Sequence, residues 1–165
     1  MITLKFYSVH KSKNHVLAPI QRSGVYNPFV LALICRTDKA RFVLSAEHVS
    51  RILTAATWLP LEGLQNGTVG VLNVAGVNLA VVDPRGRLAQ ASNTLSLEHH
   101  FIEMTFPRRF LLWVDEVEQS LEIDPSQIEK IATSPNSVAN QLVRFADETL
   151  PLLRPEVFDP GDLIS

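Results

Sequence analysis

Short apolar runs, separated by turn residues, recur along most of this chain. The pattern predicts strands over 2–9, 29–35, 41–44, 69–74, 77–82, 101–106, 109–114, 117–123, 138–146 and 150–153. Short strands at intervals of roughly 8 to 12 residues are typical of small barrels and sandwiches. The sequence therefore predicts an all-β fold.

Helical signals are few and short. Ser45 is expected to cap a short helix with one apolar face, made by Ala46, Val49, Ile52 and Leu53. A capped helix of one or two turns is predicted over 124–127, and a short terminal helix is predicted to begin at 155. These helices can only connect strands, because none is long enough to form a layer of its own.

The uncharged stretch 63–82 is long enough to span a bilayer, but its glycines, amides and valines indicate a hairpin instead. Gly76 is the natural turn residue, because glycine alone enters positive φ without cost. Asp83 is expected to end the second strand and to cap the turn that follows. Along that strand the residues divide between two faces, with Val77, Leu79 and Val81 on one and Asn78, Ala80 and Val82 on the other.

Composition narrows the class of protein further. The chain has 165 residues, 46% of them hydrophobic and 19% charged, which fits one globular domain. The net charge of -2 gives no reason to expect a nucleic acid or an anionic membrane as partner. The basic pairs Arg108-Arg109 and Arg85-x-Arg87 are interpreted as solvated turn charges. A single cysteine, Cys35, and no signal-peptide pattern indicate a cytoplasmic protein with this thiol in its core.

Candidate catalytic groups are sparse. No phosphate loop, nucleophile elbow or paired-cysteine motif is found in the sequence. Glu98, His99 and His100 are the best metal candidates, but adjacent residues of an extended chain point to opposite faces, which favours a polar loop. The acidic residues 115, 116 and 118 are interpreted as a strand edge at the surface, and both tryptophans as core. The sequence thus predicts no enzyme, no metal and no cofactor, and a protein that works through its surfaces.

Four stretches resemble the CheW family, and they follow one another along the chain in the family's order. The segment VGVLNVAGVNLAVVD (69–83) is similar to a family pattern in which a Gly-Val strand enters an Asn-Leu-Arg-Gly turn and an apolar strand ends in Val-Asp. The matching positions are Gly70, Asn73, Gly76, Val82 and Asp83. FVLSAEHVSRI (42–52) resembles the family's Val-x-x-Ile element, 101–123 contains its Val-Asp-x-Val signature, and LPLLRPEVF (150–158) resembles its closing strand and helix.

This resemblance implies two packed five-stranded SH3-like barrels within 29–158, with a boundary near 83–100, a leader over 1–28 and a tail over 159–165. It implies a non-catalytic adaptor without cofactor that couples chemoreceptor signalling tips to a CheA-type histidine kinase, at membrane-associated receptor arrays. Barrel strands covered on both faces explain the charge-free stretch. The partner-binding residues implied are Val49, Arg51, Gly70, Asn73, Ala75 and Gly76, with Gly76 and Asp83 also shaping the turn and cap.

Several positions depart from the family pattern. Ala75 replaces the turn arginine that engages receptors, Arg51 replaces a frequent glutamate, Leu111 a common glycine, and Arg154 an aspartate of the closing strand. An arginine makes directed, multi-donor contacts that alanine cannot make. Two alternatives therefore stay open: an adaptor with altered receptor binding, either kinase-only or serving a pilus-type pathway, and a small-ligand-binding barrel.

Overall fold

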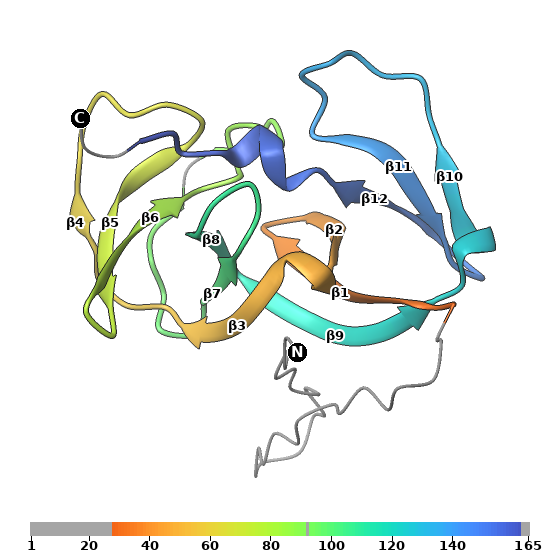
Figure 1. Cartoon of the computed structure of the whole chain (residues 1–165), viewed down its shortest axis with the longest axis horizontal. Coiled ribbons are helices and arrows are strands. Elements are labelled where there is room, and N and C mark those ends of the chain that lie inside the picture. The colour runs from red at the N-terminus through yellow and green to blue at the C-terminus, as the bar shows by residue number, and fades with distance from the viewer. Residues whose placement is uncertain (1–27, 92, 163–165) are drawn as a thin grey trace, which may run out of the picture.

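The computed structural model in Figure 1 describes residues 28–91 and 93–162. The expected strand over 2–9 and nearly all of the expected leader lie outside these ranges. The described strands are β1 (Val30–Thr37), β2 (Ala40–Ser45), β3 (Val49–Thr54), β4 (Leu59–Pro60), β5 (Thr68–Val74), β6 (Val77–Val82), β7 (His100–Met104), β8 (Phe110–Val114), β9 (Glu116–Ile123), β10 (Ile128–Lys130), β11 (Ala139–Arg144) and β12 (Thr149–Leu153). Three short 3-10 helices join them: η1 (Ala46–His48), η2 (Pro125–Gln127) and η3 (Pro155–Phe158). The all-β prediction is confirmed.

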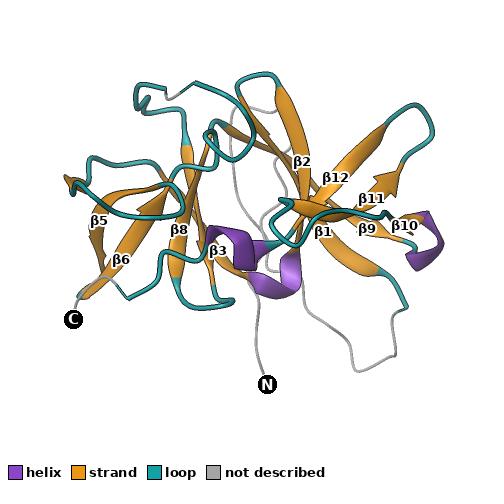
Figure 2. Cartoon of the chain, turned by 90° about the horizontal axis from the view of Figure 1, so that it is seen from above, coloured by secondary structure: helices purple, strands orange, loops and turns teal. Residues whose placement is uncertain are grey.

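The strands form two six-stranded sheets. Sheet A has the order β10-β11-β12-β2-β1-β9, and sheet B has the order β3-β7-β8-β6-β5-β4. The resemblance implied five strands in each barrel. Each sheet has five longer strands and one short edge strand in addition, because β10 contains three residues and β4 only two. Figure 2 shows the strands in two groups, with short helices between them.

The chain passes between the sheets twice. Sheet B is one continuous piece of sequence, from β3 to β8, whereas sheet A combines β1 and β2 with β9 to β12. The crossings are η1, between β2 and β3, and Asp115, between β8 and β9. The boundary expected near 83–100 instead falls within the part of the chain that builds sheet B.

Apolar side chains form three cores. One lies within sheet A, one within sheet B, and a central one joins both sheets to η3. Strand β6 contributes to two of them, since Leu79 and Val81 face the core of sheet B while Ala80 and Val82 face the central core. The predicted alternation along β6 is therefore confirmed. Both faces are covered only toward the end of the strand, because Val77 and Asn78 are exposed.

The helix predicted after Ser45 is wrong beyond its first turn. The 3-10 helix ends at His48, and the side chain of Ser45 makes no capping hydrogen bond to any described residue. Val49 and Ile52 belong to β3, where they pair with Met104 and Ile102 of β7. Both are β-branched, so pairing with a neighbouring strand prevails over a weak local helical pattern.

The other two short helices agree with the sequence. At η2, Asp124 Oδ1 accepts a hydrogen bond from Ser126 N (2.8 Å), and Asp124 N donates to Gln127 Oε1 (2.9 Å), which forms a capping box. Helix η3 begins at Pro155 and packs Phe158 into the central core. These helices therefore connect and close the two sheets, as predicted.

Candidate functional site

The β5–β6 hairpin ends in an exposed tip, residues 73–78. Its two turn residues both have positive φ, 51° for Ala75 and 86° for Gly76, as a two-residue type I′ turn requires. Asn73 Oδ1 accepts a hydrogen bond from Gly76 N (3.0 Å), and Asn73 Nδ2 donates to Asn78 Oδ1 (2.8 Å). The two amides in this otherwise apolar stretch thus close the turn.

Gly70 lies deeper in the same hairpin, in a confined position. A Cβ on Gly70 would lie 2.2 Å from Leu59 O and 2.4 Å from Trp58 Cδ1. Strand β4 can approach β5 this closely only because position 70 has no side chain. Gly70 is buried, so it shapes the sheet edge and presents no side chain to a partner.

Val49 and Arg51 both belong to β3 but differ in environment. Val49 is fully buried in the central core. Arg51 is partly exposed, and its Nε donates to Glu103 Oε2 of β7 at 2.5 Å. Of the two, only Arg51 reaches the surface.

The hairpin tip and β3 do not form one patch. In sheet B, β7, β8 and β6 separate β3 from β5. Figure 1 shows the tip at the lower left edge of the molecule, while β3 runs below its centre. The residues implied as partner-binding therefore divide into an outer hairpin and a separate edge strand.

A buried ion cluster lies where the two sheets meet. Arg85 is 0% exposed, and its Nη1 donates to Asp83 Oδ1 at 2.8 Å. Its Nη2 pairs with Asp115 Oδ1, and its guanidinium carbon lies 4.2 Å from the ring centroid of Trp113. We call Asp83, Arg85, Trp113 and Asp115 the Arg85 cluster. The interpretation of Arg85 as a solvated turn charge is wrong.

The Arg85 cluster joins both sheets. Asp83 follows β6 and Asp115 follows β8, two parallel neighbours of sheet B whose pairing includes Val82 with Leu112. Asp115 Oδ2 also accepts from Asp38 N (2.6 Å), in the β1–β2 turn of sheet A. Asp83 Oδ1 accepts a second hydrogen bond, from Arg85 N (3.0 Å), so it caps the turn after β6. The sequence signal that could have indicated this cluster is the dipeptide Val-Asp, which occurs at the ends of two apolar strands.

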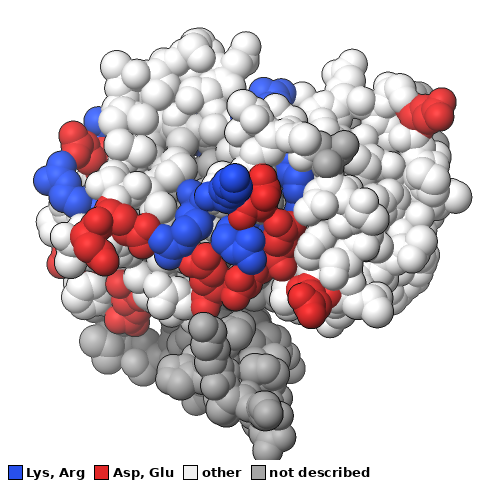
Figure 3. Space-filling view, turned by 180° about the vertical axis from the view of Figure 1, so that it is seen from behind, with Lys and Arg blue, Asp and Glu red and all other residues white. Residues whose placement is uncertain are grey.

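The interpretation of residues 115, 116 and 118 as a surface strand edge holds for two of the three. Asp115 is largely buried, whereas Glu116 and Glu118 are partly exposed and pair with Arg36 (3.0 Å) and Arg41 (2.8 Å) of sheet A. Figure 3 shows basic and acidic side chains interleaved in the middle of one face. In both contacts a glutamate is paired with an arginine, so the two charges cancel and little net charge is left to attract a partner.

Comparison with known proteins identifies the family. The model of the CheW-like domain matches residues 31–158. The chain belongs to the CheW-like domain family. A crystal structure of the scaffolding protein TtCheW from Thermoanaerobacter tengcongensis is similar in fold, with a TM-score of 0.69 and 15% identity, covering 76% of this chain and 89% of that chain. A comparison with curated protein sequences found no match.

Two candidate chemical groups of the sequence, His99 and Cys35, lie in structural environments. His99 Nδ1 accepts from Trp113 Nε1 (3.0 Å) and from Ser96 N (3.2 Å), so this histidine is part of a polar loop. Within 28–91 and 93–162, no group of three His, Cys, Asp or Glu residues could hold a metal ion. Burial, together with the charge of Glu118, raises the pKa of the Cys35 thiol and disfavours a nucleophilic thiolate.

None of the helices in the described ranges is long and apolar enough to cross a bilayer. The stretch 63–82, which has the length of a membrane span, forms the end of the β4–β5 loop and the β5–β6 hairpin instead. Its interpretation as a hairpin is confirmed.

Proposed function

We propose that this protein is a non-catalytic adaptor that couples chemoreceptors to a CheA-type histidine kinase in the cytoplasm, at receptor arrays. The observation that carries the proposal is the family match from 31 to 158, which runs through every described strand of both sheets. The likeness to a scaffolding protein in fold agrees with it. Binding through surfaces, without bound cofactor, nucleic acid or membrane insertion, is part of the same proposal.

The hairpin tip is the surface proposed to face the receptor. Its polar groups are already engaged with one another, since Asn73 bonds both Gly76 N and Asn78 Oδ1. Ala75, at its apex, adds no charge and no donor. We therefore expect weak receptor binding at the tip, with kinase binding retained because it uses other barrel surfaces.

The direct test of the adaptor is calorimetric titration of the chain with the regulatory domain of its cognate kinase. Binding with a measurable heat and co-elution on gel filtration are expected. Absence of both at protein concentrations of about 100 μM, where weak specific interfaces are detectable, contradicts the proposal.

Ala75→Arg tests the role of the tip. Ala75 already has φ of 51°, so an arginine there meets the same backbone strain and adds only its side chain. One or two charge-assisted hydrogen bonds, less the entropy of ordering a long side chain, predict receptor-tip affinity roughly tenfold higher. Kinase affinity should stay unchanged in paired titrations, and Ala75→Gln provides the uncharged control. If Ala75→Arg binds both partners as the parent does, the tip is not the receptor surface.

A kinase-only binder is the second candidate, favoured by Ala75 alone. A kinase-only binder should bind the kinase domain. A receptor fragment should neither displace that domain nor co-elute with the chain. The adaptor predicts a ternary complex of receptor fragment, chain and kinase domain, which analytical ultracentrifugation distinguishes from a binary one.

A further inference from the structure

Strand β9 forms one edge of sheet A. It is eight residues long, it pairs with β1, and no other described strand lies beside it. Apart from the bonds of that ladder, residues 117–123 make no backbone hydrogen bond to another described backbone group. Figure 1 shows β9 along the lower border of the sheet. Since an edge strand directs every second N–H and C=O away from its sheet, β9 presents a row of groups with which a further strand can pair.

The leader, residues 1–28, carries charge of one sign. It contains four Lys or Arg residues and no Asp or Glu, and its net charge is therefore +4. Residues 29–165 contain the other eleven bases and all seventeen acids, which gives a net charge of -6. The two parts attract each other, and because they belong to one chain, the leader stays at a high effective concentration near the acids.

The acidic surplus lies more with sheet A than with sheet B. The segments that build sheet A, 29–45 and 116–153, contain eight acids and five bases, whereas 46–115 contains six acids and five bases. The three acids of the C-terminal segment that the structure describes are paired with Arg108 and Arg154. A basic segment therefore finds its excess of acids on sheet A.

The four sheet edges differ in how well they suit a basic strand. In sheet B, β3 contains Arg51 and no acid, and β4 has only two residues. In sheet A, β10 has three residues, whereas β9 contains three glutamates and no base. Two of these glutamates lie against Arg36 and Arg41, and the third, Glu122, lies in the second half of the strand. Strand β9 is thus the edge with both the length and the charge to receive the leader.

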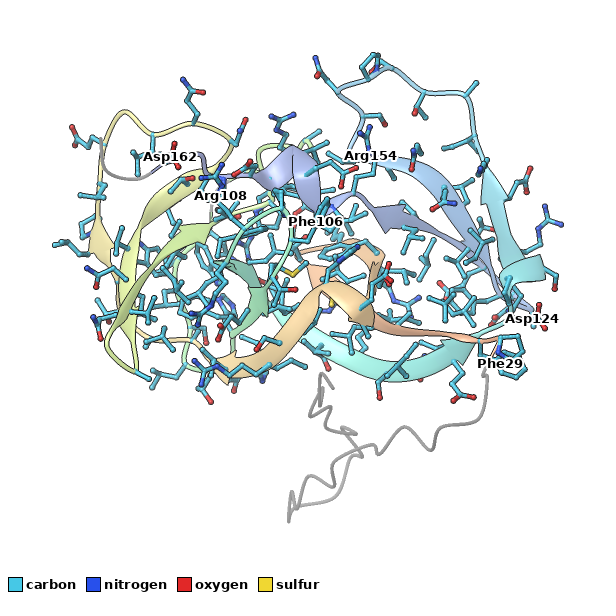
Figure 4. The ribbon with its side chains drawn as sticks, in the orientation of Figure 1. Phe29, Phe106, Arg108, Asp124, Arg154 and Asp162 are labelled. Atoms are coloured by element: carbon cyan, nitrogen blue, oxygen red, sulfur yellow. The ribbon has the colours of Figure 1, made fainter. Side chains whose placement is uncertain are left out.

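The leader enters the described structure at the end of β9. Val30 pairs with Ile123, the last residue of that strand, and Figure 4 shows Phe29 and Asp124 at the same end of the molecule. The twenty residues between the predicted strand 2–9 and β1 can span roughly 65 Å, whereas eight residues of strand extend about 26 Å. The predicted strand can therefore reach any part of β9.

The predicted strand and β9 also alternate in the same way. The predicted strand has an apolar face, made by Ile2, Leu4 and Phe6. In β9, Leu121 and Ile123 pack on the core of sheet A, where Leu121 is only partly buried, and Glu122 between them is exposed. Side by side in one sheet, the apolar residues of both strands can face the core while Lys5 and Glu122 share the outer face.

We propose that residues 2–9 dock on the edge of β9 in the same chain, as a seventh strand of sheet A. Phe6 then extends the apolar face beside Leu121, and Lys5 lies beside Glu122. The inference does not depend on the proposed function. Docking covers the longest of the four described edge strands, which could otherwise pair with the edge of a second chain. The leader thus keeps this edge from self-association.

Hydrogen–deuterium exchange of the full chain, read by mass spectrometry, tests the docked strand. Phe6→Ser removes an apolar side chain from the inner face, and peptides covering 117–123 should exchange about tenfold faster. Tyr7→Ser, on the opposite face of the same strand, is the matched control and should change the exchange much less. Strand β8, inside sheet B, is the internal reference and should exchange equally in all variants. Equal exchange of 117–123 in the parent and in Phe6→Ser overturns the inference, as do equal effects of the two variants.

Carbodiimide cross-linking tests the charge contact and the occupant. The reagent joins a lysine amine to a nearby carboxylate with loss of water. Lys5 should join Glu122 within the monomer, and Glu122→Gln should remove this product and speed the exchange of 117–123 a few-fold. Lys39, at the opposite end of β1, should not join Glu122. Absence of the Lys5 product overturns the inference. So does its occurrence in dimers alone, which indicates strand exchange between chains, or equal linking of Lys5 to Glu62 of the β4–β5 loop.

Discussion

The hairpin tip and the Arg85 cluster both place polar groups in or directly after apolar strands, but the hydrogen bonds of these groups are satisfied differently. At the tip, Asn73 bonds residues three and five positions further on, and all of these groups face solvent. In the Arg85 cluster, Arg85 bonds Asp83 and Asp115, the latter thirty positions away, and its side chain is buried. The first arrangement is local and the second depends on the whole fold.

This difference determines how each region responds to change. A lost hydrogen bond at an exposed turn is replaced by water and costs little. Removal of one partner from a buried ion cluster leaves an uncompensated charge, which costs much more than the pair contributes. Substitutions in the Arg85 cluster should therefore lower the free energy of unfolding strongly, and substitutions at the tip only weakly. The sequence of the tip can accordingly vary with the partner.

Arg85→Met should give the largest effect. It leaves the buried carboxylates of Asp83 and Asp115 without their shared cation, and the free energy of unfolding should fall by about 3–5 kcal/mol. Urea denaturation measures the change. The matched control is Arg87→Met, because Arg87 donates to Asn66 Oδ1 (2.7 Å) in a partly exposed turn and should lose about 1 kcal/mol or less. Similar losses in both variants would contradict the comparison.

Gly70→Ala should have an intermediate effect. The new methyl group would meet Leu59 O, which is backbone and cannot rotate away, so β4 must shift at a cost of about 1–3 kcal/mol. Thermal melting gives the loss, and tryptophan fluorescence should change because Trp58 packs beside Trp113 with ring centroids 5.0 Å apart. Gly86→Ala, with no atom within 4 Å of the added Cβ, should leave both signals nearly unchanged.

Gly76→Val should have the smallest effect of the three. The space around position 76 is open, so the loss comes only from placing a β-branched residue at φ of 86°, roughly 1–2 kcal/mol. Ala75→Ser, next to it, should barely move the melting temperature. A melting temperature equal to that of the parent for Gly76→Val would show that the tip adopts another turn in solution.

Features that depend on near neighbours in sequence were predictable. The alternation of β6 and the capping box at Asp124 follow from periodicity and from a four-residue motif, and both are present. The strand pattern also predicted the all-β class, because each run carried its own turn signals. These inferences need no knowledge of which strands pair.

Features that depend on strand order were missed. Arg85 meets Asp115 only because β6 and β8 are parallel neighbours, and no local pattern shows this pairing. The need for glycine at position 70 arises from the approach of β4, which the sequence does not predict. Glu103 was missed as well, since the two arginines that bond it, Arg51 and Arg109, come from β3 and from the residue before β8.

The path of the chain between the sheets also has a consequence for synthesis. Sheet B is complete once Val114 has left the ribosome, because all its strands lie between Val49 and that residue. Of the described strands, β1 and β2 are made before the others, but their remaining neighbours in sheet A are β9 and β12. One face of the opening hairpin can pack on sheet B in the central core, but the other face, with Ala32, Ile34 and Val43, must stay uncovered until the last strand emerges. Closing so long a loop is slow, and sheet B, already folded, shortens it by holding its two ends together.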